Sequence, residues 1–300
     1  MFTYCINSIN VSSDIELWNK ETNNSFCQLY IHRETLTINK NAEIIWEEKI
    51  DNVVIQELYI NRKDNSLNYY AYHDNGKLCF ACKIFKHDMV NILYDYYDIP
   101  KETVVYFIYK KIPLSLQYMG FTVLHGSAFT YKDKSIILLG DSGVGKSTLT
   151  LKMQLIGAKP LADDYVAIKN GSIYYTNIFS HINKDIFSTF STAFITETFK
   201  EITINSLTGK YIGLFTKETS GIANIDKIFL LHRSKKNHSH LENLDSSDSF
   251  TKLLNKSING IINPAIQFKE LVELSKHNIK ILNICIKPFD FENVLSIFKD

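Results

Sequence analysis

Arginine is scarce in this chain, and there is almost no net charge. Only three of the 33 basic residues are arginines (Arg33, Arg62 and Arg233). A protein that recognises phosphopeptides or RNA through guanidinium groups needs more of them. The 33 basic residues face 32 acidic ones, which leaves a formal net charge of +1 and no global field to attract nucleic acid or an anionic membrane. We therefore expect neither nucleic acid nor a membrane as a partner, and any anionic ligand must be bound locally.

Cysteine is sparse as well. The five cysteines are odd in number and widely spaced, which argues against a disulfide framework and favours a reducing compartment. Cys79 and Cys82 have the CxxC spacing of metal and redox sites, but no second pair or suitably spaced histidine accompanies them, so we expect them to pack in a strand. No apolar run reaches eighteen residues and the first residues lack a signal-peptide pattern, so we expect a cytoplasmic protein.

Residues 1–98 predict an antiparallel β module, since short apolar alternations are separated there by turn residues. Asn75 and Gly76 predict a type I′ hairpin turn. The module has no cluster of catalytic residue types, so we interpret it as a scaffold or a partner-binding surface. Its predicted strands cover residues 26–31, 34–38, 42–47, 53–60, 67–73 and 77–85.

Residues 99–120 predict a helical connector. Pro100 suits the first helical position, residues 101–112 are apolar on most faces, and Pro113 ends or kinks that helix before a second segment near 114–119. Three hundred residues, 45% of them hydrophobic, are enough for one large or two modest domains, and we place a border near residues 95–115.

Residues 121–300 predict an α/β core. Asn170 and Gly171 predict a second type I′ hairpin turn, and residues 177–222 have no clear period. The other predicted elements are strands at 121–131, 135–139, 160–163, 165–169, 172–175, 225–231 and 279–286, and helices at 147–156, 248–256, 264–277 and 291–298.

The loop after the strand at 135–139 carries the most specific signal. It has the G-x-x-x-x-G-K-S pattern between an apolar strand and a helix, and backbone N–H groups of such a turn form a cradle for phosphate oxygens. The lysine reaches the β- and γ-phosphates and the serine hydroxyl binds Mg²⁺. We therefore expect ATP and Mg²⁺ as cofactors. The expected nucleotide-binding residues are Gly140, Asp141, Ser142, Gly143, Val144, Gly145, Lys146, Ser147 and Thr148.

Two carboxylates and one imidazole are expected near this loop. Asp163 and Asp164 follow a strand end, where open α/β sheets place ligands, so one can receive a proton from an acceptor hydroxyl while the other binds metal. His125 lies on a neighbouring strand and could tune the proton acceptor. The catalytic candidates are Asp163, Asp164, His125 and Lys146, and the metal candidates are Ser147 and Asp164. A turn-forming aspartate pair and a packing histidine are the alternative interpretations.

Residues 121–169 resemble the nucleotide-binding core of the HPr kinase/phosphorylase family. The similarity is carried by His125-Gly-Ser-Ala128, by Leu138 to Ser147 and by Gly157 to Asp164. It implies a P-loop core similar to phosphoenolpyruvate carboxykinase, an aspartate beside the histidine as general base, and a seryl hydroxyl as acceptor. The late glycine- and arginine-containing signature of true HPr kinases has no counterpart in residues 178–222. The layout with a β module more closely resembles the HPr-kinase-like proteins of peptide-maturation clusters, including the lasso-peptide precursor kinases.

We therefore expect a Mg²⁺-dependent kinase that transfers the γ-phosphoryl group of ATP to a serine hydroxyl on a precursor peptide or protein. The alternatives are an HPr serine kinase, a kinase for a small molecule such as free serine, and a nucleotide-gated binding module that only hydrolyses nucleotide. Arg233, at the end of a predicted strand, could contact phosphate or be a surface residue. The sequence leaves open which aspartate is the base and what the oligomeric state is, with a homo-oligomer among the allowed arrangements.

Overall fold

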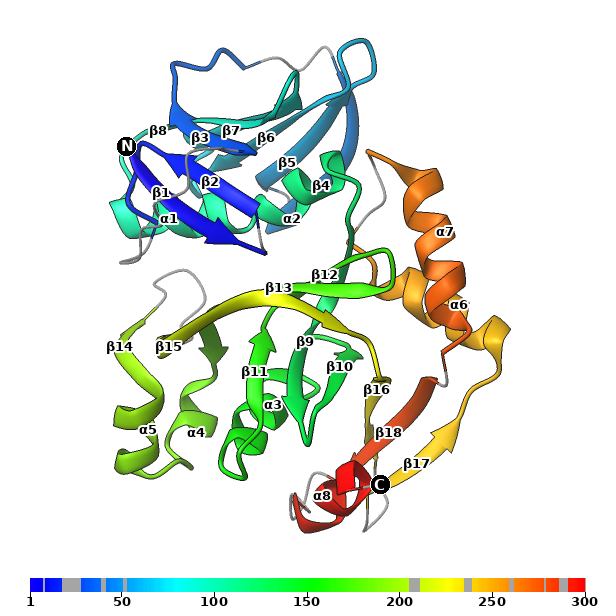
Figure 1. Cartoon of the computed structure of the whole chain (residues 1–300). Helices are drawn as coiled ribbons and strands as arrows, with labels where there is room; N and C mark the ends of the chain where they lie inside the picture. The colour runs from blue at the N-terminus through cyan, green and yellow to red at the C-terminus, as the bar shows by residue number, and fades with distance from the viewer. Residues whose placement is uncertain are drawn as a thin grey trace. The chain divides into compact units, whose positions relative to one another are not determined.

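The computed structural model describes residues 1–7, 9–17, 28–38, 42–50, 53–204, 211–234, 239–258, 262–277, 279–285 and 291–299. The chain forms two compact units, Met1–Met119 and Gly120–Asp300, and is of mixed α/β class, as expected (Figure 1). Some residues of the predicted segments (26, 27, 205–210 and 286) lie outside the described residues.

The first unit is built on an eight-stranded sheet with the order β1-β2-β3-β8-β7-β6-β5-β4. Its strands are β1 (Phe2–Ile6), β2 (Ile9–Ser13), β3 (Leu29–Arg33), β4 (Glu43–Ile50), β5 (Val53–Asn61), β6 (Ser66–Tyr72), β7 (Leu78–Lys86) and β8 (Val90–Tyr96). The expected wholly antiparallel module is wrong at two pairs, because β3 is parallel to both β2 and β8. Residues 34–38, all of them described, form no strand. Parallel pairing joins segments far apart in the chain, which local alternation does not reveal.

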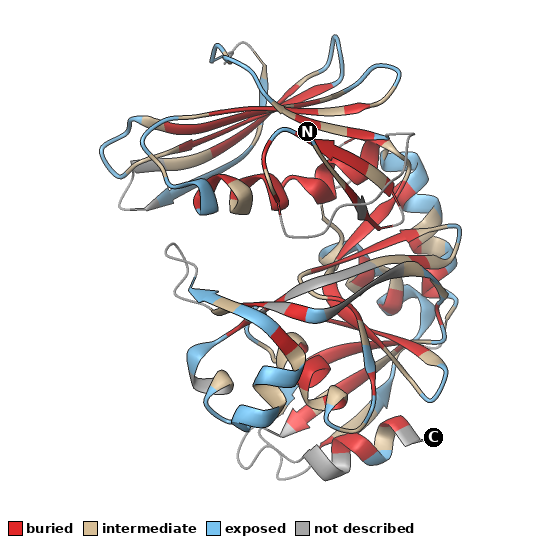
Figure 2. Ribbon diagram, turned by 60° about the vertical axis from the view of Figure 1, so that its left-hand side comes forward, coloured by how far each residue is buried: buried red, intermediate tan, exposed pale blue. Residues whose placement is uncertain are grey.

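Two helices, α1 (Lys101–Tyr109) and α2 (Ile112–Tyr118), belong to this first unit (Figure 2). They pack against β7 and β8, and Phe107 of α1 stacks on Phe80 of β7 with ring centroids 4.9 Å apart. Pro113 occupies the first turn of α2, where its missing N–H costs no helical hydrogen bond. The segment that joins the units in sequence is thus also part of the first unit's core.

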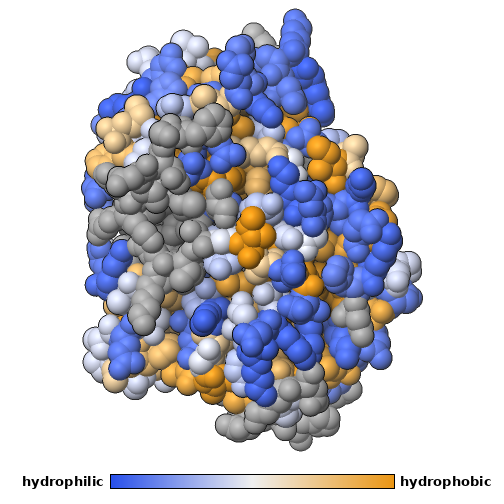
Figure 3. Space-filling view, viewed as in Figure 1, coloured by the Kyte–Doolittle hydropathy of each residue, from blue (hydrophilic) through white to orange (hydrophobic). Residues whose placement is uncertain are grey.

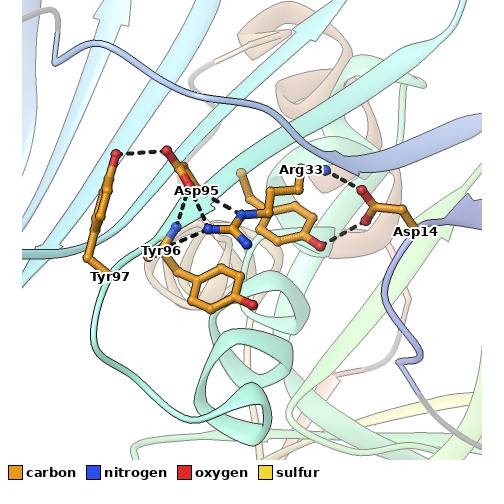
Figure 4. A network of polar contacts seen from close by, with 6 residues as sticks. Asp14, Arg33, Asp95, Tyr96 and Tyr97 are labelled. Atoms are coloured by element: carbon orange, nitrogen blue, oxygen red, sulfur yellow. Dashed lines mark hydrogen bonds and ion pairs between the residues drawn. The ribbon is translucent and has the colours of Figure 1, made fainter.

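A polar network fastens β3 to β8 (Figure 4). The Arg33 guanidinium donates to the Asp95 carboxylate at 3.4 Å and lies 4.2 Å from the centroid of the Tyr96 ring. Asp14, just after β2, accepts the Tyr94 hydroxyl at 2.8 Å and the Arg33 backbone N–H. These contacts reinforce parallel pairs whose slanted ladder bonds are slightly less stable than antiparallel ones.

Lys111 is buried between α1 and α2, with its ammonium 3.1 Å from the centroid of the Tyr69 ring and in electrostatic contact with the Cys82 thiol. Burial lowers the pKa of Lys111 to about 7, because the charged form loses its hydration. Burial also raises the pKa of the Cys82 thiol to about 12. Cys79 and Cys82 are free, buried thiols on β7, so their expected packing role in a strand is confirmed.

The free energy of unfolding should rise from pH 7 to 9, because native Lys111, with a pKa of about 7, loses its proton while unfolded Lys111, with a pKa of 10.5, still holds it. The unfolded state then binds more protons, so the free energy of unfolding rises with pH, by at most about 1.4 kcal/mol per pH unit. Above pH 9, ionisation of Cys82 in the unfolded state opposes this rise. Urea titrations at a series of pH values give the free energy of unfolding at each pH. Its increase per pH unit should be smaller for Lys111→Met than for wild type or Lys110→Met. An equal increase in all three proteins would contradict the assignment.

The second unit is built on a ten-stranded sheet with the order β14-β15-β13-β12-β9-β10-β16-β18-β17, and β11 pairs with β9 off this path. Its strands are β9 (Thr122–Tyr131), β10 (Lys134–Gly140), β11 (Lys159–Ala162), β12 (Tyr165–Lys169), β13 (Ser172–Ile182), β14 (Phe199–Ile204), β15 (Tyr211–Asn224), β16 (Lys227–Ser234), β17 (His240–Asn243) and β18 (Ile279–Cys285). Its helices are α3 (Lys146–Gln154), α4 (Lys184–Phe187), α5 (Thr192–Thr198), α6 (Ser246–Lys256), α7 (Pro264–Ser275) and α8 (Phe291–Lys299). β16 is parallel to β10 and β18, and the other pairs are antiparallel.

Strand β10 lies at the centre of the second unit's core. Ile137 and Leu139 pack with residues of α6 and α7, while Ile136 and Leu138 pack with residues of α3 and α8. A strand that is covered on both faces is apolar at consecutive positions, which explains the uninterrupted run at 136–139. The carboxyl end of β10 therefore leaves the sheet between helices on either side.

The two predicted Asn-Gly turns differ. Asn170 and Gly171 have φ angles of 53° and 70°, as a type I′ turn requires, so that prediction is confirmed. At the other turn Gly76 has a φ of 77° but Asn75 has no positive φ, and the Gly76 N–H donates to the His73 carbonyl. This turn is a longer loop next to a register shift in the β6–β7 pair, so the type I′ assignment there is wrong.

The surface is mostly polar where Figure 3 views it, with hydrophobic residues scattered in small groups. Some large hydrophobic side chains are nevertheless exposed in the second unit, among them Ile204, Ile222 and Phe268. No helix among the described ranges has both the length and the apolar character needed to cross a membrane.

Candidate functional site

The chain turns sharply where β10 ends, through a glycine loop that we define as residues 140–145. Gly140, Gly143 and Gly145 all have positive φ angles, of 153°, 77° and 115°. A Cβ atom on Gly140 would lie 2.8 Å from the Leu231 carbonyl oxygen and 2.9 Å from a methyl carbon of Val144. Only glycine fits there, so the path of the loop depends on the absence of that side chain.

Lys146, the first residue of α3, folds back over the glycine loop. Its ammonium donates to the carbonyl oxygens of Gly140 and Asp141, at 3.0 Å each. Burial lowers the pKa of Lys146, and the nearby carboxylates of Asp163 and Asp164 act in the opposite direction. The structure thus brings Lys146 and both predicted aspartates together.

Two serine hydroxyls hold the Asp163 carboxylate. Ser147 of α3 donates to Oδ1 and Ser180 of β13 donates to Oδ2, both at 2.7 Å. Ser180 was missed in the sequence because residues 177–222 have no period and a single serine there carries no signal. The pair of Ser147 and Asp163 presents hard oxygen donors at the start of α3, which suits Mg²⁺.

Asp164 lies against the strand that carries His125. Its φ angle is 73°, in the left-handed region that few non-glycine residues adopt, and its carbonyl oxygen accepts the Gly126 N–H at 3.3 Å. The next residue, Tyr165, pairs directly with His125 across β12 and β9. Asp164 therefore lies in the turn between β11 and β12, next to the strand of His125, and a strained turn of this kind is typical of functional sites.

The segment after His125 positions α3. A Cβ atom on Gly126 would lie 2.7 Å from both the Leu138 carbonyl oxygen and a methyl carbon of Leu139, so this glycine lets β9 approach β10 closely. The next residue, Ser127, shares a hydrogen bond of 3.0 Å with Thr150 of α3, and both side chains are buried. This bond fixes the helix that begins with Lys146 and Ser147 onto the sheet.

Two further cations contact the glycine loop from other elements. The Arg233 guanidinium, at the end of β16, donates to the Gly143 carbonyl oxygen. Lys256, in the last turn of α6, forms an ion pair with Asp141, and this hydrogen-bonded contact lowers the pKa of Asp141. Arg233 was a weak candidate in the sequence, and Lys256 was missed because nothing near it in the chain points to the loop.

The described part of the chain contains no group of three or more histidine, cysteine, aspartate or glutamate side chains that could hold a metal by themselves. A Mg²⁺ ion bound with a nucleotide needs only one or two protein oxygens, since phosphates and water supply the other ligands. The donor set of Ser147 and Asp163 fits that requirement.

No protein-family model matches the chain, and no curated protein matches it.

The contribution of the buried hydrogen bond between Ser127 and Thr150 to stability can be tested by substitution. Thr150→Val should lower the free energy of unfolding by about 1–3 kcal/mol, because it leaves the buried Ser127 hydroxyl without this partner. Ser127→Ala should also destabilise the protein, but the double variant should lose less than the sum of the two single losses. Chemical denaturation of the four proteins measures the coupling. Strictly additive losses would show that the bond contributes nothing.

Proposed function

We propose that this protein is a P-loop kinase that transfers the γ-phosphoryl group of ATP to a serine hydroxyl, in the presence of Mg²⁺. The observation that carries the proposal is the convergence at the end of β10 of the glycine loop, Lys146, and the two carboxylates of Asp163 and Asp164. Phosphoryl transfer requires positioning and charge neutralisation above all, and these groups supply both.

The glycine loop and the start of α3 would hold the phosphates. A helix N-terminus carries partial positive charge and unpaired N–H groups, and α3 begins directly after Gly145. Lys146 would exchange its two carbonyl partners for phosphate oxygens, which are stronger acceptors because they are charged. Arg233 would brace the loop through the Gly143 carbonyl.

The two aspartates receive different roles in this proposal. Asp163 is hydrogen-bonded to Ser147, so we assign these two residues as the Mg²⁺ ligands. Asp163 thus takes the place of Asp164, which the sequence suggested as a metal ligand. Asp164, beside the strand of His125, is assigned as the general base. The serine oxygen bonds to the γ-phosphorus as the bond to the β–γ bridging oxygen breaks. Asp164 accepts the hydroxyl proton, and ADP leaves with the bridging oxygen.

A peptide acceptor is the remaining part of the proposal. It is supported by the resemblance of residues 121–169 to HPr kinases and by the overall layout, in which a β module precedes the P-loop core. HPr protein and free serine are competing acceptors. A nucleotide-gated module that only hydrolyses ATP is the competing function of another class.

Lys146→Ala should abolish phosphoryl transfer, because it removes the buried cation at the loop. The test incubates wild type, Lys146→Ala and a control, Lys152→Ala on the same helix, with ATP, Mg²⁺ and an acceptor panel of serine-ended precursor peptides, HPr protein and free serine. Intact-mass analysis should show one added phosphoryl group on a peptide with wild type and with the control only. Hydrolysis of ATP without any phosphorylated acceptor would favour the nucleotide-gated module instead.

Substitution of each aspartate should separate the two roles. Asp164→Asn should lower kcat about 10²- to 10⁴-fold, the usual contribution of a positioned base, with ATP affinity little changed. Asp163→Asn should raise the Mg²⁺ concentration needed for half-maximal activity, because a neutral amide is a weaker ligand. Steady-state kinetics over a Mg²⁺ series measure both. Full turnover by Asp164→Asn would refute its assignment as base.

A further inference from the structure

Lys256 contacts the glycine loop, although it lies far from the loop in the sequence. Its ammonium pairs with the Asp141 carboxylate, and it lowers the pKa of Lys146 electrostatically, so the two lysines lie close enough to repel each other. The Lys256 side chain is only 20% exposed, whereas its partner Asp141 is 84% exposed. The cation is thus held in the structure while the carboxylate faces solvent.

The position of Lys256 is fixed by main-chain contacts. Ser257, the next residue, forms a β-bridge with Leu124, and the Ile258 N–H donates to the Val123 carbonyl oxygen at 2.8 Å. These contacts fasten the end of α6 to β9 immediately before His125. Lys256 is therefore held beside the glycine loop from the α6 side of the sheet, the side on which Leu124 packs with Leu253.

We propose that Lys256 leaves Asp141 and binds the terminal phosphate of the bound nucleoside triphosphate, and that Asp141 is its counter-ion only when the nucleotide is absent. This inference rests on the proposed nucleotide-binding function. It makes Lys256 a phosphate-contacting residue that distinguishes a triphosphate from a diphosphate.

The exchange of partners is energetically cheap. An ion pair whose carboxylate is exposed to water contributes little, because solvent screens it, so Lys256 loses little on leaving Asp141. A triphosphate offers more negative charge than one carboxylate and stronger acceptors for the ammonium. Once Lys256 has left, the Asp141 carboxylate repels the phosphates only weakly, because it is 84% exposed and solvent screens its charge.

The choice of the terminal phosphate follows from the neighbours of Lys256. Its ammonium interacts electrostatically with Lys146, the lysine that reaches the β- and γ-phosphates in a loop of this pattern. Lys146 also interacts with the carboxylates of Asp163 and Asp164, the proposed metal ligand and base. A second cation beside this lysine is therefore placed for the phosphate nearest to those carboxylates, which is the terminal one.

Calorimetric titration of ATP and of ADP, each with Mg²⁺, tests this proposal by binding alone. Lys256→Ala should raise the Kd for ATP about tenfold, the size of one charge-assisted hydrogen bond, and the Kd for ADP less than about twofold. Lys256→Arg should restore part of the ATP affinity. Lys252→Ala, one helical turn earlier in α6, controls for general loss of charge and should leave the ratio of the two Kd values unchanged.

A second variant tests the counter-ion role. Asp141→Asn removes the competing carboxylate, so it should lower the Kd for ATP about threefold, consistent with the small energy of an exposed pair. In that background Lys256→Ala should still raise the ATP Kd. Thermal unfolding of every variant shows whether the fold is retained.

Equal weakening of ATP and ADP by Lys256→Ala, or no weakening of either, would overturn the proposal, as would weaker ATP binding in Asp141→Asn. If wild type binds neither nucleotide, both this inference and the proposed function fail. If wild type binds both and Lys146→Ala binds neither, while Lys256→Ala binds like wild type, only the role of Lys256 fails.

Discussion

The close approach of main chain at the carboxyl end of β10 sets the geometry of the candidate site. Gly140 leaves no room for a side chain beside the Leu231 carbonyl of β16, and Gly126 leaves none beside the Leu138 carbonyl of β10. Because these two backbone contacts draw β9, β10 and β16 together, the chain can leave β10 in a tight loop and begin α3 at once. The positions of Lys146 and Ser147 follow from that exit.

The second unit combines an apolar core around β10 with polar residues at the carboxyl end of that strand. Strand β10 is buried on both faces by helices, so its path cannot shift without opening the core on one side or the other. The candidate site residues gather around the carboxyl end of β10, where the apolar core ends. There, burial disfavours the charged form of Lys146, whereas the carboxylates of Asp163 and Asp164 favour it. Serine hydroxyls donate hydrogen bonds to both carboxylate oxygens of Asp163. A chain with a net charge of only +1 thus concentrates cations at one loop.

The first unit is held by interactions of a different kind. Its parallel pairs β2–β3 and β3–β8 are reinforced by the contacts of Arg33 with Asp95 and Tyr96, and by those of Asp14. Helices α1 and α2 complete its core through aromatic packing such as that of Phe107 on Phe80. Its role as a scaffold or a partner-binding surface stays a prediction.

Local signals predicted the local features. The apolar run at 136–139, the glycines after it and the Asn170–Gly171 turn were all read correctly, because the conformations concerned depend on a few adjacent residues. The aspartate pair could be placed at a strand end for the same reason. The turn at Gly76 shows the limit, since a register shift in the flanking strands overrode the local preference.

The sequence by itself therefore determined the glycine loop, the order of strands and helices around it and the residue types available for the proposed phosphate binding. Only the tertiary structure decided that β3 is parallel to its neighbours, that Ser147 and Ser180 meet on Asp163 rather than Asp164, and that Lys256 reaches Asp141. The physical reason is the distance along the chain. A backbone turn is encoded by the residues that form it, whereas a contact across 115 positions depends on how every intervening strand and helix packs.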